Sequence, residues 1–538
     1  MRTGEWRSSI SEKSTMKNVY ILAIDHGTSG IKASLISEKG SVVESDFHRT
    51  PISFLTGGGA EQDPEDWWDG VIMTARRLLA RGTVRKQDIV AVSVSSTFST
   101  TVAVDERGRQ VCNALTWLDS RGAPHVRRLM KGFPSFQGYG LAKVMKWLPK
   151  TAGGPTLSGK DDIAHVLYWK HERPDIYDRA FMFLPSKDYL NARLTGKLAA
   201  SHDSVQLFWL TDTRDVDNIH YDDELIALAG IDRTKLPPLM RSTEVLGTLL
   251  PAVAEEMGLD KGTKVVMGSP DHQCACIGSG AVRDYDGHVY IGTSSWVQCV
   301  VPFKKTDVLH SIASFPTAIS GRYQSVNEQD IAGGCLDFLV GNLLYGEHGA
   351  APGAWPDDPY GEIIRRAEKV AAGSHKVIFT PWLNGERTPV DDPTVRACIY
   401  NISKTTTFDH LARAFLEGVA YNTRWVLGYV EKFVARKLEE LTIIGGGARS
   451  DLWCRIFADV LNRRIKRTRD PLQANARGAA FIALVGLEFI SFDDIPGLME
   501  YDQVFDPDRQ NRKMYDELFK AFLEIYRNNR GLFRRLNA

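Results

Sequence analysis

The stretch between residues 19 and 37 constrains the fold of this chain most strongly. Residues 19–24 (VYILAI) have the composition of a buried β-strand, residues 25–32 read DHGTSGIK, and an apolar run then resumes. This order predicts a β-hairpin that binds phosphate, because glycine lets the backbone approach a polyphosphate closely and Asp25 can hold Mg²⁺ at the strand end. The expected phosphate-binding residues of this hairpin are Gly27, Thr28, Ser29 and Lys32. A polar turn that binds no ligand is the alternative.

Three later stretches also place small or acidic residues where an apolar strand ends. Residues 265–273 (VVMGSPDHQ) place Asp271 after a strand, and residues 287–295 (GHVYIGTSS) repeat the order of strand, glycine and hydroxyls. Residues 441–451 (LTIIGGGARSD) run from a strand through a glycine turn into a helix. This last turn lacks the G-x-G-x-x-G spacing of dinucleotide-binding proteins, so a nicotinamide enzyme is disfavoured.

In this order, the four stretches resemble the actin-like ATPase clan and, within it, the FGGY family of carbohydrate kinases. Further landmarks of that family are residues 61–68 (EQDPEDWW), 117–121 (WLDSR), 187–196 (KDYLNARLTG), 244–247 (EVLG) and 385–393 (GERTPVDDP). The resemblance extends from about residue 19 to about residue 506. It implies an α/β fold with two actin-like (ribonuclease H-like) domains around a central cleft for ATP and sugar.

The resemblance also implies a division of the chain. Residues 18–284 are expected to form an N-terminal sugar-binding domain and residues 285–500 a C-terminal ATP-binding domain. Residues 1–17 are then a flexible N-terminal tail, and residues 501–538 a helical C-terminal tail whose arginines face solvent. The length of 538 residues suits two α/β domains of ordinary size.

The implied activity is ATP-dependent phosphorylation of a sugar hydroxyl, with Asp271 as the general base. Such a base must lie within hydrogen-bond reach of the hydroxyl that attacks the γ-phosphorus. The alternative for Asp271 is a cap on the helix that follows, a role that is compatible with catalysis. The implied ATP-binding residues are Gly27, Thr28, Ser29, Lys32, Gly292, Thr293, Gly333, Gly446, Gly447 and Asp451, with Mg²⁺ held by Asp25.

The residues expected to face the sugar depart from the family pattern. The usual Gly-Gln pair corresponds to Ser96-Thr97, and the next two positions are Phe98 and Ser99, where a xylulose kinase would show Met-His and a glycerol kinase Arg-Glu. Phe98 is therefore expected to form an apolar wall, with Ser99 beside it as a hydrogen-bonding neighbour. The implied substrate-binding residues are Phe98, Ser99, Trp117, Asp119, Asp271, His272 and Gln273. For Asp119 the alternative is a structural ion pair with Arg121.

A ketopentose such as xylulose is the predicted substrate, and other substrates stay open: ribulose, a deoxy-sugar, an erythritol-like compound or glycerol. A non-catalytic sugar or nucleotide sensor on the same scaffold is the alternative from a different class. Intact Asp25, Lys32, Asp271 and Thr293 argue against it, because a sensor has no need for all four. A chaperone-type ATPase of the same clan is disfavoured, because no peptide-binding β-domain follows the nucleotide module.

Composition points to a cytoplasmic protein that acts on a small molecule. Lys and Arg total 66, as do Asp and Glu, so no net field favours nucleic acid or a membrane as a partner. The seven cysteines are odd in number and mostly lie in apolar runs, which suggests reduced thiols. Residues 1–16 lack the apolar core of a signal peptide, and either Met1 or Met16 can be the start. The expected assemblies include a homodimer.

Overall fold

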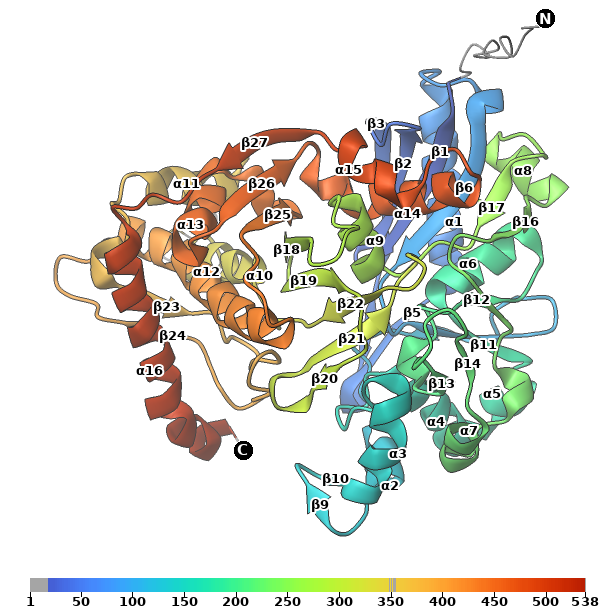
Figure 1. The fold of residues 1–538 in the computed structure, drawn as a ribbon, viewed down its shortest axis with the longest axis horizontal. Helices are drawn as coiled ribbons and strands as arrows, with labels where there is room; N and C mark the ends of the chain where they lie inside the picture. The colour runs from blue at the N-terminus through green and yellow to red at the C-terminus, as the bar shows by residue number, and fades with distance from the viewer. Residues whose placement is uncertain (1–17, 348, 350, 352–354, 538) are drawn as a thin grey trace, which may run out of the picture.

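The computed structural model describes residues 18–347, 349, 351 and 355–537 and contains two large β-sheets (Figure 1). The first sheet has six strands: β16 (Val245–Thr248), β17 (Lys264–Val266), β6 (Ile89–Ser96), β1 (Tyr20–Gly27), β2 (Gly30–Ser37) and β3 (Val42–Arg49). The second has eight: β20 (Thr306–Asp307), β21 (Ile312–Pro316), β22 (Tyr323–Val326), β19 (Ser295–Val301), β18 (Gly287–Ile291), β25 (Glu440–Ile444), β26 (Arg464–Thr468) and β27 (Tyr501–Phe505). The predicted N-terminal tail, residues 1–17, lies outside the described residues. Met1 and Met16, the two candidate start residues, lie within that tail.

The two sheets share the same central topology. In the first, β1 and β2 form an antiparallel hairpin, and β6 and β17 then follow parallel to β1. In the second, β18 and β19 form an antiparallel hairpin, and β25 and β26 follow parallel to β18. The two predicted phosphate loops are therefore the turns of equivalent hairpins, one in each sheet. The predicted α/β class is confirmed.

A lobe with its own core extends from the first sheet, at the lower right of Figure 1. Its sheet has five strands: β11 (Met182–Pro185), β7 (Thr101–Val104), β8 (Ala114–Leu115), β5 (Gly59–Gln62) and β4 (Ser53–Leu55). Its helices include α2 (Ala123–Met130), α3 (Leu141–Thr151), α4 (Asp162–Glu172), α5 (Pro174–Arg179) and α7 (Asp223–Ala229), whereas α6 (Ser186–Thr195) packs into the core of the first sheet. Trp147, Trp169 and Phe183 are among its buried side chains.

Local sequence signals set several helix boundaries. Helix α1 (Pro64–Ala80) begins where it does because the Asp63 carboxylate accepts a hydrogen bond from Glu65 N at 2.9 Å and Pro64 occupies the first helical position. Helix α12 spans Phe408–Phe433. Among the described residues, no helix combines the length and hydropathy needed to cross a bilayer.

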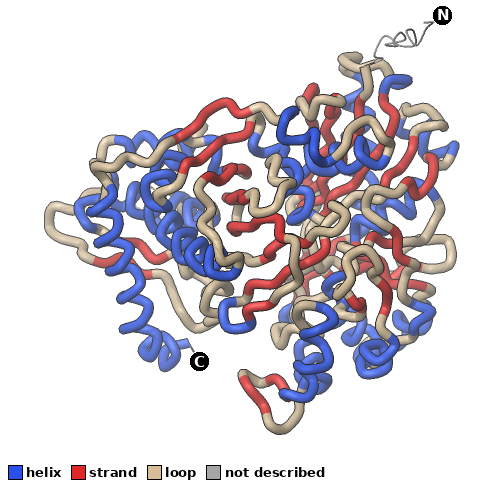
Figure 2. The backbone as a smooth tube through the Cα atoms, in the orientation of Figure 1, coloured by secondary structure: helices blue, strands red, loops and turns tan. Residues whose placement is uncertain are grey.

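The C-terminal segment is part of the second domain rather than a separate tail. Strand β27 extends the eight-stranded sheet, and helix α16 (Arg512–Asn537) stands at the edge of that domain in Figures 1 and 2. Tyr515 and Phe522 of α16 are fully buried, and Phe522 lies 5.2 Å from Trp382, measured between ring centroids. The basic residues of α16 lie on the other face, so the apolar stripe fixes how the helix packs.

Helix α14 (Ala474–Gly486) follows β26 in the chain but packs against the first sheet, where it shares a core with β1, β6 and helix α9 (Asp271–Gly278). Two glycines allow the close approach of α14 and α9. A Cβ on Gly278 would lie 1.8 Å from Ala474 O, and a Cβ on Gly478 would lie 1.9 Å from Cys274 O. Neither position can hold a side chain unless the helices separate.

We expect the Gly478→Ala substitution to destabilise the protein by roughly 1–3 kcal/mol, because its methyl group would force α14 away from α9. Denaturant unfolding measures this change. Gly428→Ala is the matched control: it also lies inside a helix, α12, but a Cβ there meets no atom within 4 Å. This control is expected to be stabilising by about 0.5–1 kcal/mol, the helix-propensity difference. Equal midpoints for the two variants would contradict the packing account.

Candidate active site

Asp271 is the first residue of α9 and follows the loop 267–270 that leaves β17. The loop turns at Gly268, whose φ is +70° and whose missing Cβ would lie 2.2 Å from Val94 O. The alternative considered for Asp271, a cap on α9, is not what the structure has, because Pro270 occupies the N-cap position and no side chain caps the helix. Asp271 Oδ1 instead accepts a hydrogen bond from the next residue, His272 N, at 2.8 Å. Asp271 as a whole is half-buried.

Three carboxylates lie close enough to interact electrostatically. Burial raises the pKa of Asp271 well above its usual range, and the negative charges of Asp25 and Glu328 raise it further. Asp25 lies two residues before the end of β1 in the first domain, whereas Glu328 follows β22 in the second. The two domains therefore meet at Asp271. A carboxylate with a raised pKa is a better proton acceptor than an ordinary aspartate.

The first hairpin is fixed by contacts on both sides of its turn. Asp25 lies opposite Lys32 in the β1–β2 register, and Lys32 Nζ is 3.6 Å from Asp25 Oδ2. Trp117 Nε1 donates to Thr28 Oγ1 at 2.8 Å, so this predicted sugar residue also holds the phosphate turn. Ser29, at the tip, is exposed. The hairpin thus presents the Asp25 carboxylate, the Lys32 amino group and the exposed Ser29 at the same end.

The second hairpin lies against the other predicted ATP-binding glycines. Gly333 N donates to Gly292 O at 2.8 Å, and Ala332 N donates to Thr293 O at 2.7 Å. Thr293 itself is exposed. The hairpin therefore brings Gly292, Thr293 and Gly333 together at the end of β18.

The glycine turn after β25 reaches the same place. A Cβ on Gly445 would lie 2.5 Å from Ile291 O, and a Cβ on Gly447 would lie 2.4 Å from Ile291 Cγ2. Gly446 is exposed, and a Cβ there would meet no atom nearer than 3.8 Å. The backbone of Gly446 is therefore accessible to a ligand. Gly445 and Gly447, in contrast, have no room for a side chain because they pack against Ile291.

Asp451, the remaining predicted nucleotide residue, begins helix α13 (Asp451–Leu461). Ser450 caps this helix by accepting from Trp453 N at 3.2 Å. The Asp451 carboxylate is exposed and accepts from Arg467 at 2.7 Å. The contact of Asp451 with ATP stays a prediction. Its side chain already has an ionic partner in Arg467.

Aromatic rings line the first domain beside Asp271. Phe98 lies edge-on to His272, with the ring centroids 5.6 Å apart, and His272 stacks on Trp296 at 4.2 Å. Gln298 Nε2 is 2.7 Å from His272 Nδ1, and burial lowers the pKa of His272, so its ring is neutral. Ser99 has a φ of +56° and donates to the carbonyl of Lys160. The predicted apolar wall at Phe98 therefore lies next to the predicted base.

Two predicted sugar-binding residues are enclosed by protein. Asp119 is fully buried, and its carboxylate accepts from Ala60 N at 2.9 Å and from the Arg121 guanidinium at 2.6 Å. These contacts favour the alternative considered for it, a structural ion pair. Gln273 is also fully buried, and its Nε2 donates to Pro316 O at 3.1 Å. Both residues support the walls of the site from behind.

Arg387 and Glu328 join the site from the second domain. Arg387 pairs with Glu328 at 2.5 Å and with Asp330 at 3.2 Å, and its guanidinium lies 5.9 Å from the Trp117 ring centroid. These contacts let Arg387 connect the two domains. Glu328 was not predicted as a site residue. The feature of the sequence that could have identified Glu328 as a site residue is its position two residues after the buried strand β22.

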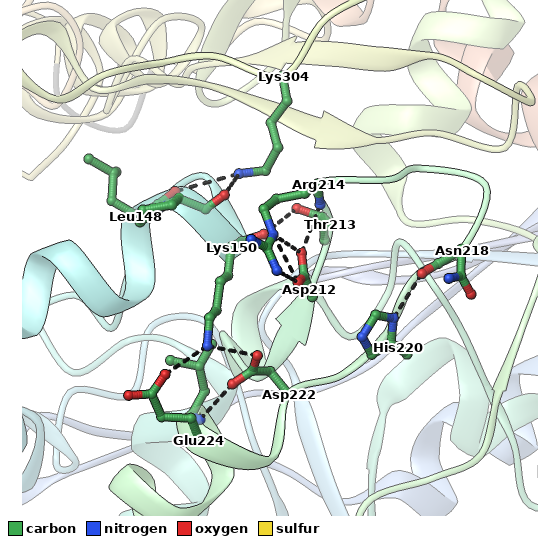
Figure 3. Close-up of polar contacts among 12 residues, drawn as sticks. Leu148, Lys150, Asp212, Thr213, Arg214, Asn218, His220, Asp222, Glu224 and Lys304 are labelled. Atoms are coloured by element: carbon green, nitrogen blue, oxygen red, sulfur yellow. Dashed lines mark hydrogen bonds and ion pairs between the residues drawn. The ribbon is translucent and has the colours of Figure 1, made fainter.

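A separate hollow of about 430 Å³ opens between α3 and the segment around β20 (Figure 3). Its lining residues are Leu148, Pro149, Arg214, Lys304, Lys305 and Thr306. The cations there are already bonded to protein atoms: Lys304 Nζ donates to Pro149 O at 2.6 Å, and Arg214 pairs with Asp212 at 2.5 Å. None of the predicted site residues lines it, so we assign neither ATP nor sugar to it.

The acidic residues of the site fit a magnesium ion that is coordinated mainly by substrate phosphates and water. Within the described part of the chain, no group of three or more His, Cys, Asp or Glu side chains forms a metal cage. Mg²⁺ is commonly bound by one or two carboxylates together with substrate phosphates and water. Asp25 fits that pattern, because its carboxylate lies beside the turn predicted to bind phosphate.

Models of the FGGY family of carbohydrate kinases match most of the chain. The N-terminal domain of the family matches residues 20–278, and the C-terminal domain matches residues 288–487. This chain belongs to the FGGY family of carbohydrate kinases. It is an ATP-dependent sugar kinase, and the predicted family and enzyme class are confirmed.

Relatives with different substrates resemble this kinase over its full length. Xylulose kinase of Bacillus subtilis is 27% identical over 518 residues, which are 95% of this chain and 98% of that protein. Gluconokinase of the same species is 25% identical over 509 residues, 94% of this chain and 96% of that protein. The relatives therefore establish a sugar kinase without choosing between these sugars.

Solved structures agree with the fold. Ligand-bound xylulose kinase from Lactobacillus acidophilus has a TM-score of 0.83 at 23% identity and covers 96% of this chain and 99% of its own. Gluconate kinase from the same species also has a TM-score of 0.83, at 22% identity, and covers 96% and 100%. The predicted arrangement of two actin-like domains is confirmed.

We predict that kcat/KM for the sugar falls on the acid side at a pH well above the usual range of an aspartate, about pH 4. Asp271 must be ionised to accept a proton, and its pKa is raised, so protonation removes activity as the pH falls through that raised value. A pH–rate profile measures this, with circular dichroism at each pH to exclude unfolding. An acid limb at or below about pH 4 would contradict the assignment.

Proposed function

We propose that this kinase transfers the γ-phosphoryl group of ATP to a hydroxyl of a ketopentose such as xylulose, with Asp271 as the general base. The observation that carries the proposal is the position of Asp271. It begins α9, is half-buried, has a raised pKa and interacts with acids from both domains. Several relatives named xylulose kinase, at 26–27% identity, support the choice of sugar.

Asp271 would accept the proton of the attacking hydroxyl as the oxygen approaches the γ-phosphorus in line. Its hydrogen bond from His272 N fixes one carboxylate oxygen, which leaves the other to face the sugar. Phe98 and the His272 ring, which lie edge-on to each other, form an aromatic wall on one side. Such a wall suits the C–H face of a sugar and leaves hydroxyl recognition to the polar groups around it.

ATP would lie between the two hairpins. Gly27, Thr28, Ser29 and Lys32 of the first hairpin and Gly292 and Thr293 of the second would hold its phosphates, and Gly333, Gly446 and Gly447 would contact the nucleoside side. Two hairpin turns supply backbone N–H donors to phosphate from opposite sides. Asp25 would hold Mg²⁺, which when bound neutralises part of the phosphate charge.

Closure of the domains would complete the site. Arg387 already bridges Glu328 and Asp330 of the second domain and lies near Trp117 of the first. A small further approach would shut the sugar and phosphates away from water. Exclusion of water favours transfer to the sugar over wasteful hydrolysis of ATP.

An ATP-consumption screen tests the proposal, with ketoses, aldoses, polyols and gluconate as candidate acceptors. We expect one ketopentose to stimulate turnover well above the no-sugar control. Asp271→Ala is expected to lose about two to four orders of magnitude of that stimulation, the usual contribution of general-base catalysis. EDTA should stop turnover, and added Mg²⁺ should restore it.

The screen separates the remaining alternatives. Stimulation by gluconate or a polyol alone would keep the kinase and replace the ketopentose. ATP binding without stimulation by any acceptor would favour the non-catalytic sensor. Turnover that survives in Asp271→Ala at near wild-type rate would overturn the base assignment.

A further inference from the structure

The loop that carries Asp271 is bonded to a buried carboxylate behind it. Ser269 is fully buried, and its Oγ donates to Asp203 Oδ2 at 2.6 Å. The other oxygen of Asp203, Oδ1, accepts from Ser201 Oγ at 2.6 Å. Two serines therefore occupy the two oxygens of one carboxylate that is 1% exposed. Of these two serines, only Ser269 belongs to the loop 267–270.

Helix α6 holds the same loop at a second point. Met267 O accepts from Lys187 Nζ at 3.0 Å and from Asn191 Nδ2 at 2.8 Å, and all three groups are buried. Lys187 pairs with Asp188, whose other oxygen accepts from Ser204 Oγ at 2.5 Å. The turn 201–204 thus contributes to both anchors. They fix the loop four and two residues before Asp271.

Burying charged groups costs free energy unless each group has a hydrogen-bond or ionic partner. Apolar side chains would bury this loop at a lower cost in free energy if burial were all that it required. Hydrogen bonds are directional, whereas apolar contacts are not, and a bond to a charged group is among the stronger ones. The network therefore fixes the direction of the loop. A misplacement of about 1 Å at a reacting group can cost on the order of 100-fold in rate.

We propose that Asp203 is a positioning residue for the general base: through Ser269 it sets the position of Asp271 against the sugar hydroxyl. The inference rests on the proposed function, in which Asp271 accepts the proton. Asp203 touches neither ATP nor sugar in this account. Its effect on the reaction passes through one hydrogen bond, and that bond can be removed separately from the rest of the network.

Ser269→Ala and Ser201→Ala form a matched pair, because each removes one serine hydroxyl from the same carboxylate. We expect Ser269→Ala to lower kcat by about 10- to 100-fold, with the KM values for sugar and ATP within about twofold of wild type. Ser201→Ala is expected to keep kcat within about twofold. The thermal midpoints of the two variants should shift alike, because each variant loses one hydrogen bond to the same carboxylate. A purely structural role for Asp203 would then predict equal kcat values as well.

A double-mutant comparison tests whether the effect passes through Ser269. Asp203→Asn should lower kcat, and adding Ser269→Ala to it should change kcat no further, because residues that act as one unit are not additive. Fully additive losses would overturn the proposal. Circular dichroism of each variant shows whether it is folded.

Asp271→Ala, assayed in parallel, separates this inference from the function on which it rests. If Asp271→Ala is inactive and Ser269→Ala keeps its kcat or matches Ser201→Ala, the positioning role alone is overturned. If Asp271→Ala keeps activity within about tenfold of wild type, the base assignment fails and the positioning role fails with it.

Discussion

The close contact between α9 and α14 is the constraint on which the site depends. Gly278 and Gly478 bring each backbone against the other helix, and the buried Arg477 donates to Gly278 O at 3.2 Å and to Gly40 O at 3.1 Å. Helix α9 begins with the predicted base, and α14 comes from the part of the chain that follows the nucleotide turn. The contact therefore joins a helix from the part of the chain that matches the N-terminal family domain to one from the part that matches the C-terminal family domain.

The repeated topology places two equivalent hairpins where they could serve one ligand. Each sheet has an antiparallel hairpin followed by two parallel strands, and the turns at residues 27–30 and 292–294 occupy equivalent places. Lys32 Nζ donates to Leu472 O at 3.1 Å, just before α14, so the first hairpin contacts the segment that joins β26 of the second sheet to α14. Phosphate groups held between such turns would meet donors from both domains, while the base approaches from α9.

Local features of the site were predictable from the sequence because they depend on residue type at a turn. The first hairpin, the cap at Asp63 and the glycines at residues 445–447 all follow from this chemistry. Tertiary packing decided the rest. Nothing local distinguishes Asp119, which is buried in an ion pair, from an acid that faces a cleft.

The same limit applies to long-range order. Helix α14 lies within the predicted second domain, residues 285–500, but its alanine-rich surface packs on the first sheet. Residues 501–538 were expected as a tail, yet the aromatic stripe of α16 completes a core. In both cases the helix could be predicted from the local sequence, whereas its packing partner is set by contacts between residues that are far apart in the chain.

The most direct test of this account is a single-turnover measurement on Asp271→Asn, with ATP affinity determined on the same protein. The account predicts that ATP binds as in the wild type, because its proposed contacts lie on the hairpins and the glycine turn, while phosphoryl transfer to the sugar slows by at least about 100-fold. Transfer at the wild-type rate, or loss of ATP binding together with transfer, would contradict the assignment of Asp271 as the base.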